Sequence, residues 1–592
     1  MFGWLYRCGG QRMKVFLDLM WFFKQEKRSY LTGIILLLFV ALLQLVPPKV
    51  VGIFVDHMKD GTLTQSILIY WLVTLVIVAL LMYGLRYYWR IMIFGSAVKL
   101  SRLLRNRLYG HFTKMSQAFY QRKRVGDLMA HATNDLNAIQ QTAGSGVLTL
   151  VDSLATGGFV VIAMATTISW KLTLIALLPM PLMAILTSWY GSLLHKRFHK
   201  AQESFSELND KTQESVSGIK VIKTFGQEKE ELESFTSKTN EVVKKNVSVV
   251  KVDALYDPTI SVIAGISYFL SIVFGARFVI AGEMTIGELV SFTTYLSLLI
   301  WPMLAFGWLF NIVERGRASY DRISSILNEE IDIDNNKDAL DNVPSGNITY
   351  SIESFSYPST TAPVLKNIHF TLNKGETLGI VGKTGSGKTT LLKLLLREFD
   401  GEHIYFGGRA LAGYQLDELR KAFGYVPQEH FLFSATIAEN ISFAKGKCTI
   451  EEIYHAAKLA AIHEDIKVFT DGYETVVGER GVSLSGGQKQ RISIARALIL
   501  NPEVLLLDDS LSAVDAKTEE TILSSLRKER EGKTTVITAH RLSAIQHANQ
   551  ILVLDEGQII QRGTHEELMN QSGWYKNMYL RQQLEQLVEH GG

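Results

Sequence analysis

A glycine-rich segment in the second half of the chain has the spacing of a loop that binds phosphate groups. The sequence GKTGSGKT (382–389) continues an apolar, strand-like run and precedes an apolar, helix-like run, LLKLLLREF. Glycines at this spacing let backbone N–H groups wrap phosphates, and the helix that follows turns its N-terminus toward negative charge. We expect Lys388 to reach the β- and γ-phosphates of ATP and Thr389 to hold Mg²⁺. The expected nucleotide-binding residues are Gly382, Lys383, Thr384, Gly385, Ser386, Gly387, Lys388, Thr389 and Thr390.

A second chemical feature is an apolar run that ends in two carboxylates, VLLLDD (504–509). A buried strand that ends in an acidic residue is typical of the metal-holding strand of enzymes that cleave nucleoside triphosphates. We therefore expect Asp508 to join Thr389 at the Mg²⁺ ion.

Between these two features lies VSLSGGQKQRISIARAL (482–498), which closely resembles the signature of ABC ATPases. In that family the LSGGQ residues cap a nucleotide that is held by the phosphate loop of another domain. The resemblance adds four residues to the expected nucleotide site, and they are Ser485, Gly486, Gly487 and Gln488. One chain supplies one phosphate loop and one signature, so the resemblance implies that two chains sandwich two ATP molecules.

Other short segments match further elements of the same family in the expected order. The resemblance implies that Tyr357 in FSYP stacks on adenine and that Gln428 in GYVPQ touches Mg²⁺ and water. It implies that His540 in ITAHRLS contacts the γ-phosphate and that the loop 512–515 crosses between subunits. Glu479 in VVGERG matches a segment that touches the membrane domain in exporters. We expect the catalytic residues to be Asp509, Gln428 and His540. We expect the residues that hold Mg²⁺ to be Thr389, Gln428 and Asp508.

One residue departs from the family pattern. The second acid of the metal-holding strand is usually Glu, which polarises the attacking water, and here it is Asp509. The shorter side chain withdraws the carboxylate by roughly 1 Å, and a displacement of that order can cost about 10²-fold in rate. In heterodimeric multidrug exporters of Gram-positive bacteria, one half has this Asp and the other keeps the Glu. We expect a slow site on this chain, with a homodimer in which Asp suffices as the alternative.

The sequence pattern of the first half of the chain predicts a membrane domain. Crossing a bilayer takes about 20 mostly apolar residues in a helix. Six stretches of that kind are expected at about 30–55, 66–94, 145–168, 171–191, 258–281 and 286–311. Residues 13–28 are expected to form an amphipathic helix at the inner membrane interface, with Val15, Phe16, Leu19, Met20 and Phe23 on its apolar face.

Charged residues predict the orientation of these helices. The N-terminal segment and the long connections at 95–144 and 192–257 are rich in Lys and Arg. In the short connections near 56–65, 169–171 and 282–285, Lys59 and Lys171 are the only Lys or Arg residues. The excess of positive charge predicts that both termini, both long loops and the ATPase domain lie in the cytoplasm. The loop tips, 119–131 and 217–231, resemble the regions around the coupling helices of ABC exporters, which dock on ATPase domains.

These features predict a chain of two parts: an all-α transmembrane domain of six helices with long cytoplasmic extensions, and an α/β phosphate-loop ATPase domain. The expected boundaries are 1–28 for the N-terminal segment, 29–327 for the membrane domain, 328–343 for a linker and 344–592 for the ATPase domain. The net charge of +3 is small and mixed in sign, so it does not favour nucleic acid as a partner.

Two charged residues within the predicted spans are candidates for burial. Asp152 and Arg86 are expected at similar depths, roughly 24 and 30 Å below the outer surface at 1.5 Å per residue. A charge at that depth is normally paired or faces a cavity. A structural pair of Asp152 with Arg86 or Arg90 is the favoured interpretation, and a role in binding substrate is the alternative.

The combined prediction is one half of an ATP-driven exporter in the cytoplasmic membrane, with amphiphilic small molecules as substrates and a second half-transporter as partner. Two alternatives remain open at this stage. One is a homodimeric flippase for lipids or lipid-linked molecules, and the other is a membrane protein whose conformation is regulated by ATP without pumping.

Overall fold

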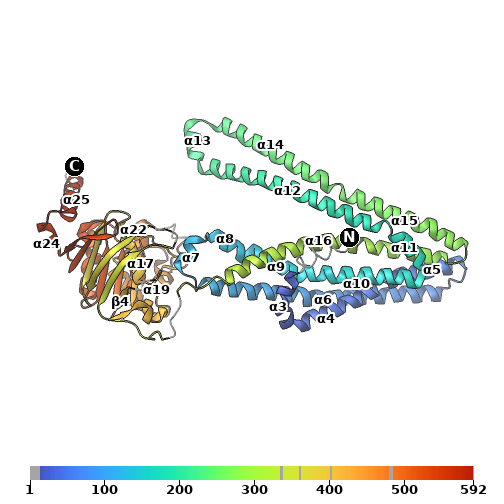
Figure 1. The fold of residues 1–592 in the computed structure, drawn as a ribbon, viewed down its shortest axis with the longest axis horizontal. Helices are drawn as coiled ribbons and strands as arrows, with labels where there is room; N and C mark the ends of the chain where they lie inside the picture. Colours follow the sequence, from blue (N-terminus) through green and yellow to red (C-terminus); the bar gives the residue numbers. More distant parts are fainter. Residues whose placement is uncertain are drawn as a thin grey trace. The chain divides into compact units, whose positions relative to one another are not determined.

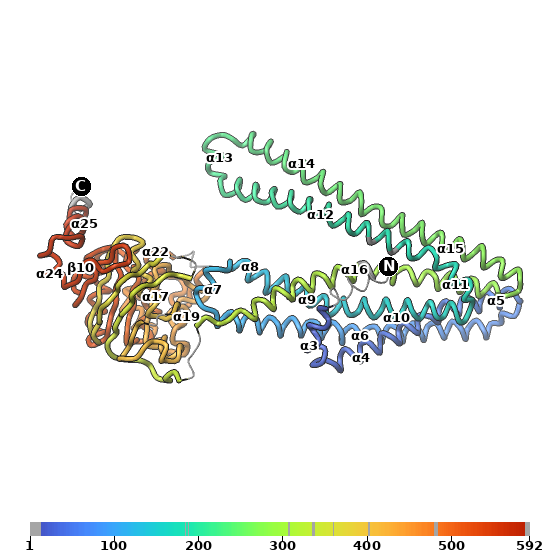
Figure 2. Tube along the Cα trace, in the orientation of Figure 1, coloured from blue at the N-terminus to red at the C-terminus, as the bar shows by residue number. Residues whose placement is uncertain are grey.

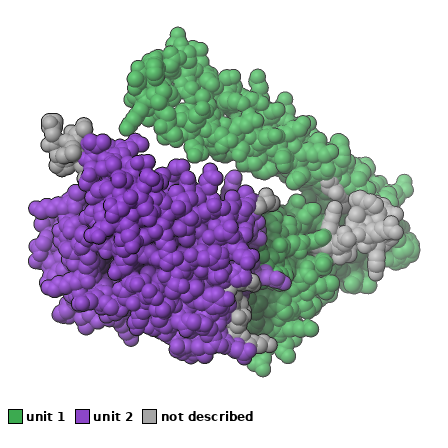
Figure 3. Space-filling model, turned by 60° about the vertical axis from the view of Figure 1, so that its left-hand side comes forward, with its two compact units in different colours: residues 1–113, 126–329 green, residues 114–125, 330–592 purple. Residues whose placement is uncertain are grey.

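The computed structural model describes residues 14–333, 338–358, 360, 362–400, 403–478 and 484–590. The chain forms two compact units, which Figure 3 distinguishes by colour. Unit 1 comprises Met1–Thr113 and Gly126–Glu329, and unit 2 comprises Lys114–Val125 and Glu330–Gly592. The short segment 114–125 therefore belongs to the second unit although helices of the first unit flank it. Glu479 and the first 12 residues lie outside the described residues.

Unit 1 is entirely helical (Figure 1). Three short π-helical turns, η1 (His131–Asp135), η2 (Thr142–Gly146) and η3 (Ala165–Ser169), interrupt its third long helical stretch. Its α-helices are α2 (Lys14–Asp18), α3 (Met20–Gln25), α4 (Lys27–Leu43), α5 (Val46–Lys59), α6 (Gln65–Phe112), α8 (Val125–Ala130), α9 (Leu136–Gln141), α10 (Val147–Met164), α11 (Trp170–Leu177), α12 (Met180–Ser217), α13 (Ile219–Phe225), α14 (Glu228–Asp253), α15 (Tyr256–Ile280) and α16 (Ile286–Leu327).

Five continuous helical stretches of the described chain are long and apolar enough to cross a membrane. They are Lys27–Lys59, Gln65–Phe112, Val125–Leu177, Glu228–Ile280 and Ile286–Leu327. The fourth predicted span, 171–191, is not a separate continuous helix. Helix α11 ends at Leu177, and α12 starts beside Pro181 and becomes polar after about four turns, at HKRFHK. The apolar residues of that span are therefore divided between two helices.

Proline breaks the first span, and α16 satisfies the backbone there. Helix α4 ends at Leu43, and α5 begins with Val46 just before Pro47 and Pro48. The Tyr295 hydroxyl of α16 donates to the Leu45 carbonyl at 2.6 Å. The Ser291 hydroxyl, one turn away, donates to the Pro48 carbonyl at 2.9 Å. Side chains of a neighbouring helix thus donate to backbone carbonyls at the break, where polar groups need partners in a lipid environment.

Helices α12 and α14 form a long antiparallel hairpin with α13 at its tip, as the tube in Figure 2 shows. Two ion pairs join the arms, Lys211 to Glu231 at 2.9 Å and Lys238 to Glu207 at 2.7 Å. The tip leaves apolar side chains uncovered: Val221 is 61% exposed and Phe225 is 73% exposed.

Unit 2 contains two sheets. Within the described residues, four antiparallel strands follow the order β2-β1-β4-β5 and six strands follow the order β10-β9-β3-β8-β7-β6. The second sheet is parallel from β9 to β6, and β10 pairs antiparallel at its edge. The strands are β1 (Ile348–Phe355), β2 (Leu365–Leu372), β3 (Thr377–Gly382), β4 (Ile404–Phe406), β5 (Arg409–Ala410), β6 (Phe423–Val426), β7 (Val504–Asp508), β8 (Thr534–Thr538), β9 (Gln550–Asp555) and β10 (Gln558–Gly563).

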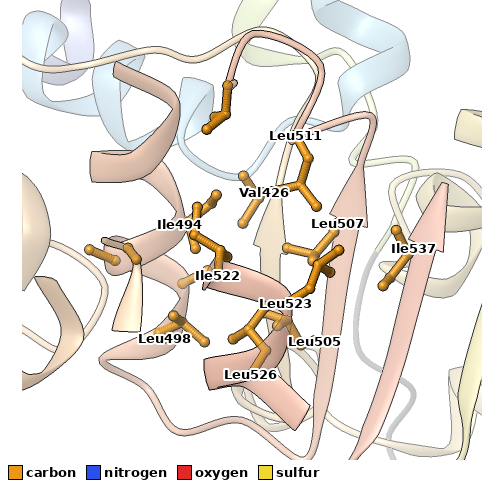
Figure 4. Close-up of a cluster of buried hydrophobic side chains, with 14 of the residues drawn as sticks. Val426, Ile494, Leu498, Leu505, Leu507, Leu511, Ile522, Leu523, Leu526 and Ile537 are labelled. Carbon is orange, nitrogen blue, oxygen red and sulfur yellow. The ribbon is translucent and has the colours of Figure 1, made fainter. Parts of the chain in front are cut away.

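Helices cover the sheets and fix the strand ends that carry function. They are α7 (Gln117–Arg122), α17 (Lys388–Leu395), α18 (Leu416–Lys421), α19 (Ile437–Ser442), α20 (Ile450–Leu459), α21 (His463–Val468), α22 (Gly486–Leu498), α23 (Ala516–Glu529), α24 (His565–Asn570) and α25 (Trp574–His590). Figure 4 shows Leu505 and Leu507 of β7 in one cluster with Leu498 of α22 and Leu526 of α23. All four are buried, so β7 is held firmly where its carboxyl end carries Asp508.

Candidate functional site

The phosphate loop connects β3 to α17 with the geometry that its glycines predict. Gly385 and Gly387 have positive φ angles of 83° and 99°. A Cβ atom at Gly387 would lie 2.6 Å from Leu365 Cδ2, so a larger residue does not fit there. The Lys388 ammonium group is buried and donates to the carbonyls of Gly382 at 2.8 Å and Lys383 at 3.0 Å. Burial lowers the pKa of Lys388, and the nearby carboxylates of Asp509 and Asp508 oppose that shift.

Asp508 stands at the end of β7, buried under three hydroxyl groups. It accepts a hydrogen bond from Thr538 Oγ1 at 2.7 Å, from Thr389 Oγ1 at 3.1 Å and from Tyr425 Oη at 3.4 Å. These donors come from β8, α17 and β6, so three neighbouring elements fix one carboxylate. The structure thereby brings Asp508 and Thr389 together, as the two predicted metal ligands require.

Asp509 follows directly and is pinned through its backbone. Its φ of 46° is unusual for a residue with a side chain. Its N–H donates to both the carbonyl and the hydroxyl of Thr538, at 3.1 and 3.0 Å. The carboxylate accepts from Gln428 Nε2 at 3.4 Å and lies 3.9 Å from His540 Nε2. The three predicted catalytic side chains therefore meet at one point.

The predicted adenine-stacking residue lies beside the phosphate loop. The Tyr357 hydroxyl and Thr390 Oγ1 are 2.9 Å apart, which ties the ring to α17. The rings of Phe355 and Phe399 pack against the Tyr357 ring in T-shaped, edge-on arrangements, with centroid distances of 5.3 and 5.0 Å. Tyr357 keeps an intermediate exposure, so part of the ring remains accessible.

The signature residues form the start of α22 instead of joining this cluster. Ser485 caps the helix: its hydroxyl accepts from the Gln488 N–H at 3.3 Å, and the Gln488 side chain accepts from the Ser485 N–H at 3.1 Å. Gln488 is thus occupied in the cap. Ser485 and Gly486 are exposed. Within the described residues, no hydrogen bond connects the residues 485–488 to the phosphate loop.

The segment 114–125 packs on unit 2. Ala118 of α7 belongs to the hydrophobic cluster that includes Leu391 and Phe423. The Ser116 hydroxyl donates to Asp332 Oδ2 at 2.7 Å, and Arg122 lies 3.7 Å from the same oxygen. Residues 119–125 of one predicted coupling region therefore belong to the nucleotide-binding unit, whereas its residues 126–131 belong to unit 1.

Family models match both units. Residues 30–303 match the family model "ABC transporter transmembrane region", and residues 365–512 match the family model "ABC transporter". The two matches together cover more than half of the chain, and they occur in the same order as the two units.

The chain belongs to the ABC transporter family.

Curated relatives of this ABC transporter match over its whole length. It is 48% identical to "Multidrug resistance-like ATP-binding protein MdlA" of Escherichia coli (strain K12), over 98% of either chain. It is 47% identical to "Probable multidrug resistance ABC transporter ATP-binding/permease protein YheI" of Bacillus subtilis (strain 168), over 97% of this chain and 98% of the relative. A solved "Structure of a bacterial Atm1-family ABC exporter with ATP bound" has a TM-score of 0.78 and 26% identity, over 94% of this chain and 99% of the other.

Several expectations from the sequence are thereby confirmed. The fold is a helical transmembrane unit joined to an α/β ABC ATPase unit. The chain is a half-transporter that hydrolyses ATP to drive export, and ABC exporters of this kind work as dimers. It is a multi-pass protein of the cytoplasmic membrane.

The described residues fit the groups that this family uses. Ser386 Oγ in the phosphate loop is buried and has no hydrogen-bond partner among the described residues, so it suits an incoming phosphate oxygen. For Mg²⁺, the ABC transporter offers a hydroxyl and a carboxylate, Thr389 and Asp508. Hard oxygen donors of this kind, few in number, are what Mg²⁺ uses when phosphate oxygens and water complete its coordination.

Three positioning residues were not found from the sequence. Gln582 of α25 donates to the His540 carbonyl at 2.8 Å and accepts from the Leu542 N–H at 2.9 Å, so it clamps the histidine loop. Thr538 holds both Asp508 and Asp509, as described above. Gln490, fully buried in α22, accepts from the Ala513 N–H at 3.2 Å and links the signature helix to the loop 512–515. Their spacing carries no signal, because each acts through a contact between distant segments.

Proposed function

We propose that this ABC transporter is the half with the slower ATP site in a heterodimeric exporter of amphiphilic small molecules. In this proposal its phosphate loop and Asp509 build one composite site with the partner's signature. Its own signature completes the second site, on a partner chain that carries Glu in place of Asp509. On this chain, Thr389 and Asp508 would hold Mg²⁺, which would supply neutralisation of phosphate charge.

The observation that carries the proposal is the constraint on Asp509. Two hydrogen bonds from its N–H to Thr538 fix its backbone, so the main chain cannot advance to offset a shorter side chain. The carboxylate is already engaged by Gln428. The Asp509 carboxylate would therefore lie too far from a water molecule positioned for in-line attack. Misplacement of a catalytic group by about 1 Å costs on the order of 10²-fold in rate.

The remaining machinery supports binding and signalling at this site. Lys388, Thr389 and Asp508 are assembled, so the site is suited to hold nucleotide even if it cleaves slowly. Gln428 and His540 contact Asp509 and would sense the γ-phosphate. The signature on α22 has its full LSGGQ sequence, and the exposed N-terminus of this 13-residue helix is suited to anion binding across a dimer.

The exposed α13 tip supports a partner chain as well. Val221 and Phe225 remain uncovered, whereas α7 is packed on unit 2 through Ala118. We propose that the ATPase domain of the partner covers α13. The proposed substrate class is supported by the two relatives described above, whose names refer to multidrug resistance.

Purification of the chain from its native membrane tests the pairing. We expect a second ABC half-transporter with the Glu to accompany it in equal amount. We also expect the chain alone to show little ATPase activity, which rises when the partner is added. A brisk ATPase from the isolated chain would favour the homodimer. Transport into inverted membrane vesicles is the second test. If the vesicles take up no amphiphile when ATP is added, the result would favour an ATP-regulated protein that does not pump.

A further inference from the structure

A cavity of about 530 Å³ lies within the helical unit, beside the junction of α4 and α5. This volume is within the range of sites that bind small molecules. Helices α5, α6, α10 and α16 and the end of α4 line it. Its polar walls include Gln44, Arg86, Asp152, Thr156 and Ser297.

One helix break and one proline within a continuous helix border this cavity. Pro47 and Pro48 lie at the α4–α5 break, and Pro302 lies inside α16, which continues past it; all three line the cavity. Pro302 has no N–H, so the Leu298 carbonyl loses its helical donor, and Leu298 lines the cavity too. Broken helices at membrane depth are tolerated where they border a cavity, and they are typical of substrate sites in transporters.

The two charges at the cavity do not form the contact pair that the sequence favoured. Within the described residues, Asp152 has no ion pair with Arg86 or Arg90 at 4.0 Å or less. Asp152 instead accepts a hydrogen bond from Thr156 at 3.3 Å. Arg90 lies over the Trp89 ring, 5.5 Å from its centroid, and is not a cavity residue. Arg86 and Asp152 therefore face one space with opposite charges and a gap between them.

We propose that this cavity binds the head group of a zwitterionic amphiphile, with its cationic part at Asp152 and its anionic part at Arg86. The inference rests on the proposed export of amphiphiles and names their charge class. A separated pair of opposite charges is complementary to a ligand that carries both charges. A singly charged ligand would satisfy one side chain and leave the other without a counter-charge in a medium of low dielectric, which is costly.

The rest of the lining suits such a ligand. Trp301 provides an aromatic face for an alkylammonium group, an interaction that strengthens when the cation is desolvated. Thr156 supports the Asp152 carboxylate from one helical turn away. Met82, Leu298 and Pro302 provide an apolar wall for the start of a hydrocarbon tail.

Three probes with the same dodecyl chain separate the head-group classes: dodecyl sulfobetaine, dodecyltrimethylammonium and dodecyl sulfate. Saturable binding is measured below micelle-forming concentrations, to the exporter with its partner in lipid nanodiscs, after subtraction of empty nanodiscs. We expect the wild type to bind the zwitterion about tenfold or more tighter than either singly charged probe. If the wild-type exporter binds the cationic or the anionic probe more tightly than the zwitterion, the proposal is overturned without recourse to any variant.

Neutralisation of each charge should change the ranking in opposite directions. With Asp152→Asn, the anion should become the best probe, and with Arg86→Gln, the cation. Arg90→Gln is the matched control, and it should leave the wild-type ranking intact. An unchanged ranking in both cavity variants, or an equal change in the control, overturns the proposal. If one variant does not fold, the other and the wild-type series still decide.

This binding assay is independent of pumping. If the exporter moves no amphiphile but binds the zwitterion selectively, the proposed function fails and the cavity assignment stands. If it exports amphiphiles without regard to head-group charge and binds the three probes alike, the cavity assignment fails and the export function stands.

Discussion

The two faces of the nucleotide-binding unit that serve ATP are built in contrasting ways. On the phosphate-loop face, functional side chains hold one another: Thr389 binds Asp508, and Gln428 binds Asp509. On the signature face, Ser485 and Gln488 bind each other's backbone within one helix cap, and Gln488 also donates to Asp465 of α21 at 3.5 Å. The contrast indicates that one face carries preassembled chemistry, whereas the other offers backbone groups that act only when a second chain approaches.

The largest effect should come from the signature face. In the complex with its partner, Gly487→Asp should reduce ATPase activity about 10²-fold or more, because it places negative charge where the partner's phosphate belongs. It also puts a Cβ atom 3.1 Å from the Ala513 carbonyl. Steady-state ATP hydrolysis measures the loss. An unchanged melting temperature shows that the variant is folded, and near-normal activity would contradict the shared-site account.

Removal of the loop lysine tests the phosphate-loop face. Lys388→Ala should abolish most photolabelling of this chain by an ATP analogue, because the ammonium group that neutralises the phosphates is lost. Lys374→Ala is a suitable control, since that lysine is exposed and pairs with Glu503 at 3.6 Å. Equal labelling of wild type and Lys388→Ala would show that the loop does not hold the nucleotide.

A smaller, local effect is expected at the histidine loop. Gln582→Ala should speed hydrogen exchange at the Leu542 amide about tenfold or more, because that N–H loses its acceptor. Gln582→Glu keeps an acceptor and should preserve protection at Leu542 while it loses the bond to the His540 carbonyl. If all three proteins exchange alike, α25 does not position the loop.

The smallest effect should come from Asp509→Asn in the complex. We expect a change of less than about threefold in ATPase activity, because the site that it serves is already slow. The same measurement on the Gly487→Asp complex provides the comparison. A loss at Asp509 as large as the loss at Gly487 would indicate two equivalent sites.

Much of this molecule could be predicted from local sequence. Strand, loop and helix around GKTGSGKT, and the acid at the end of β7, follow from residue type and spacing, and the structure places Lys388, Thr389 and Asp508 together. Of the apolar face predicted for residues 13–28, Val15 and Leu19 are buried, and Phe22, which the prediction did not include, is buried beside them. The three residues follow the spacing i, i+4, i+7, so the helical period continues across the junction of α2 and α3 at Leu19.

What the sequence could not provide depends on contacts between distant segments. Depth along two helices suggested that Asp152 and Arg86 pair, but depth does not fix the rotation of a helix, and the side chains instead border a cavity. The clamp of Gln582 on His540 joins residues 42 positions apart. The predicted domain boundaries and the roles of the individual site residues remain predictions.

The central claim is that the two ATP sites of the exporter are unequal and that the faster one uses this chain's signature with the partner's phosphate loop. Vanadate trapping of a photoreactive ATP analogue in the wild-type complex tests it directly, because trapping follows hydrolysis and the label marks the chain whose phosphate loop held the nucleotide. We predict a trapped label on the partner and little on this chain, although both chains bind the analogue before turnover. Equal trapped label on the two chains, or label mainly on this one, would contradict the account.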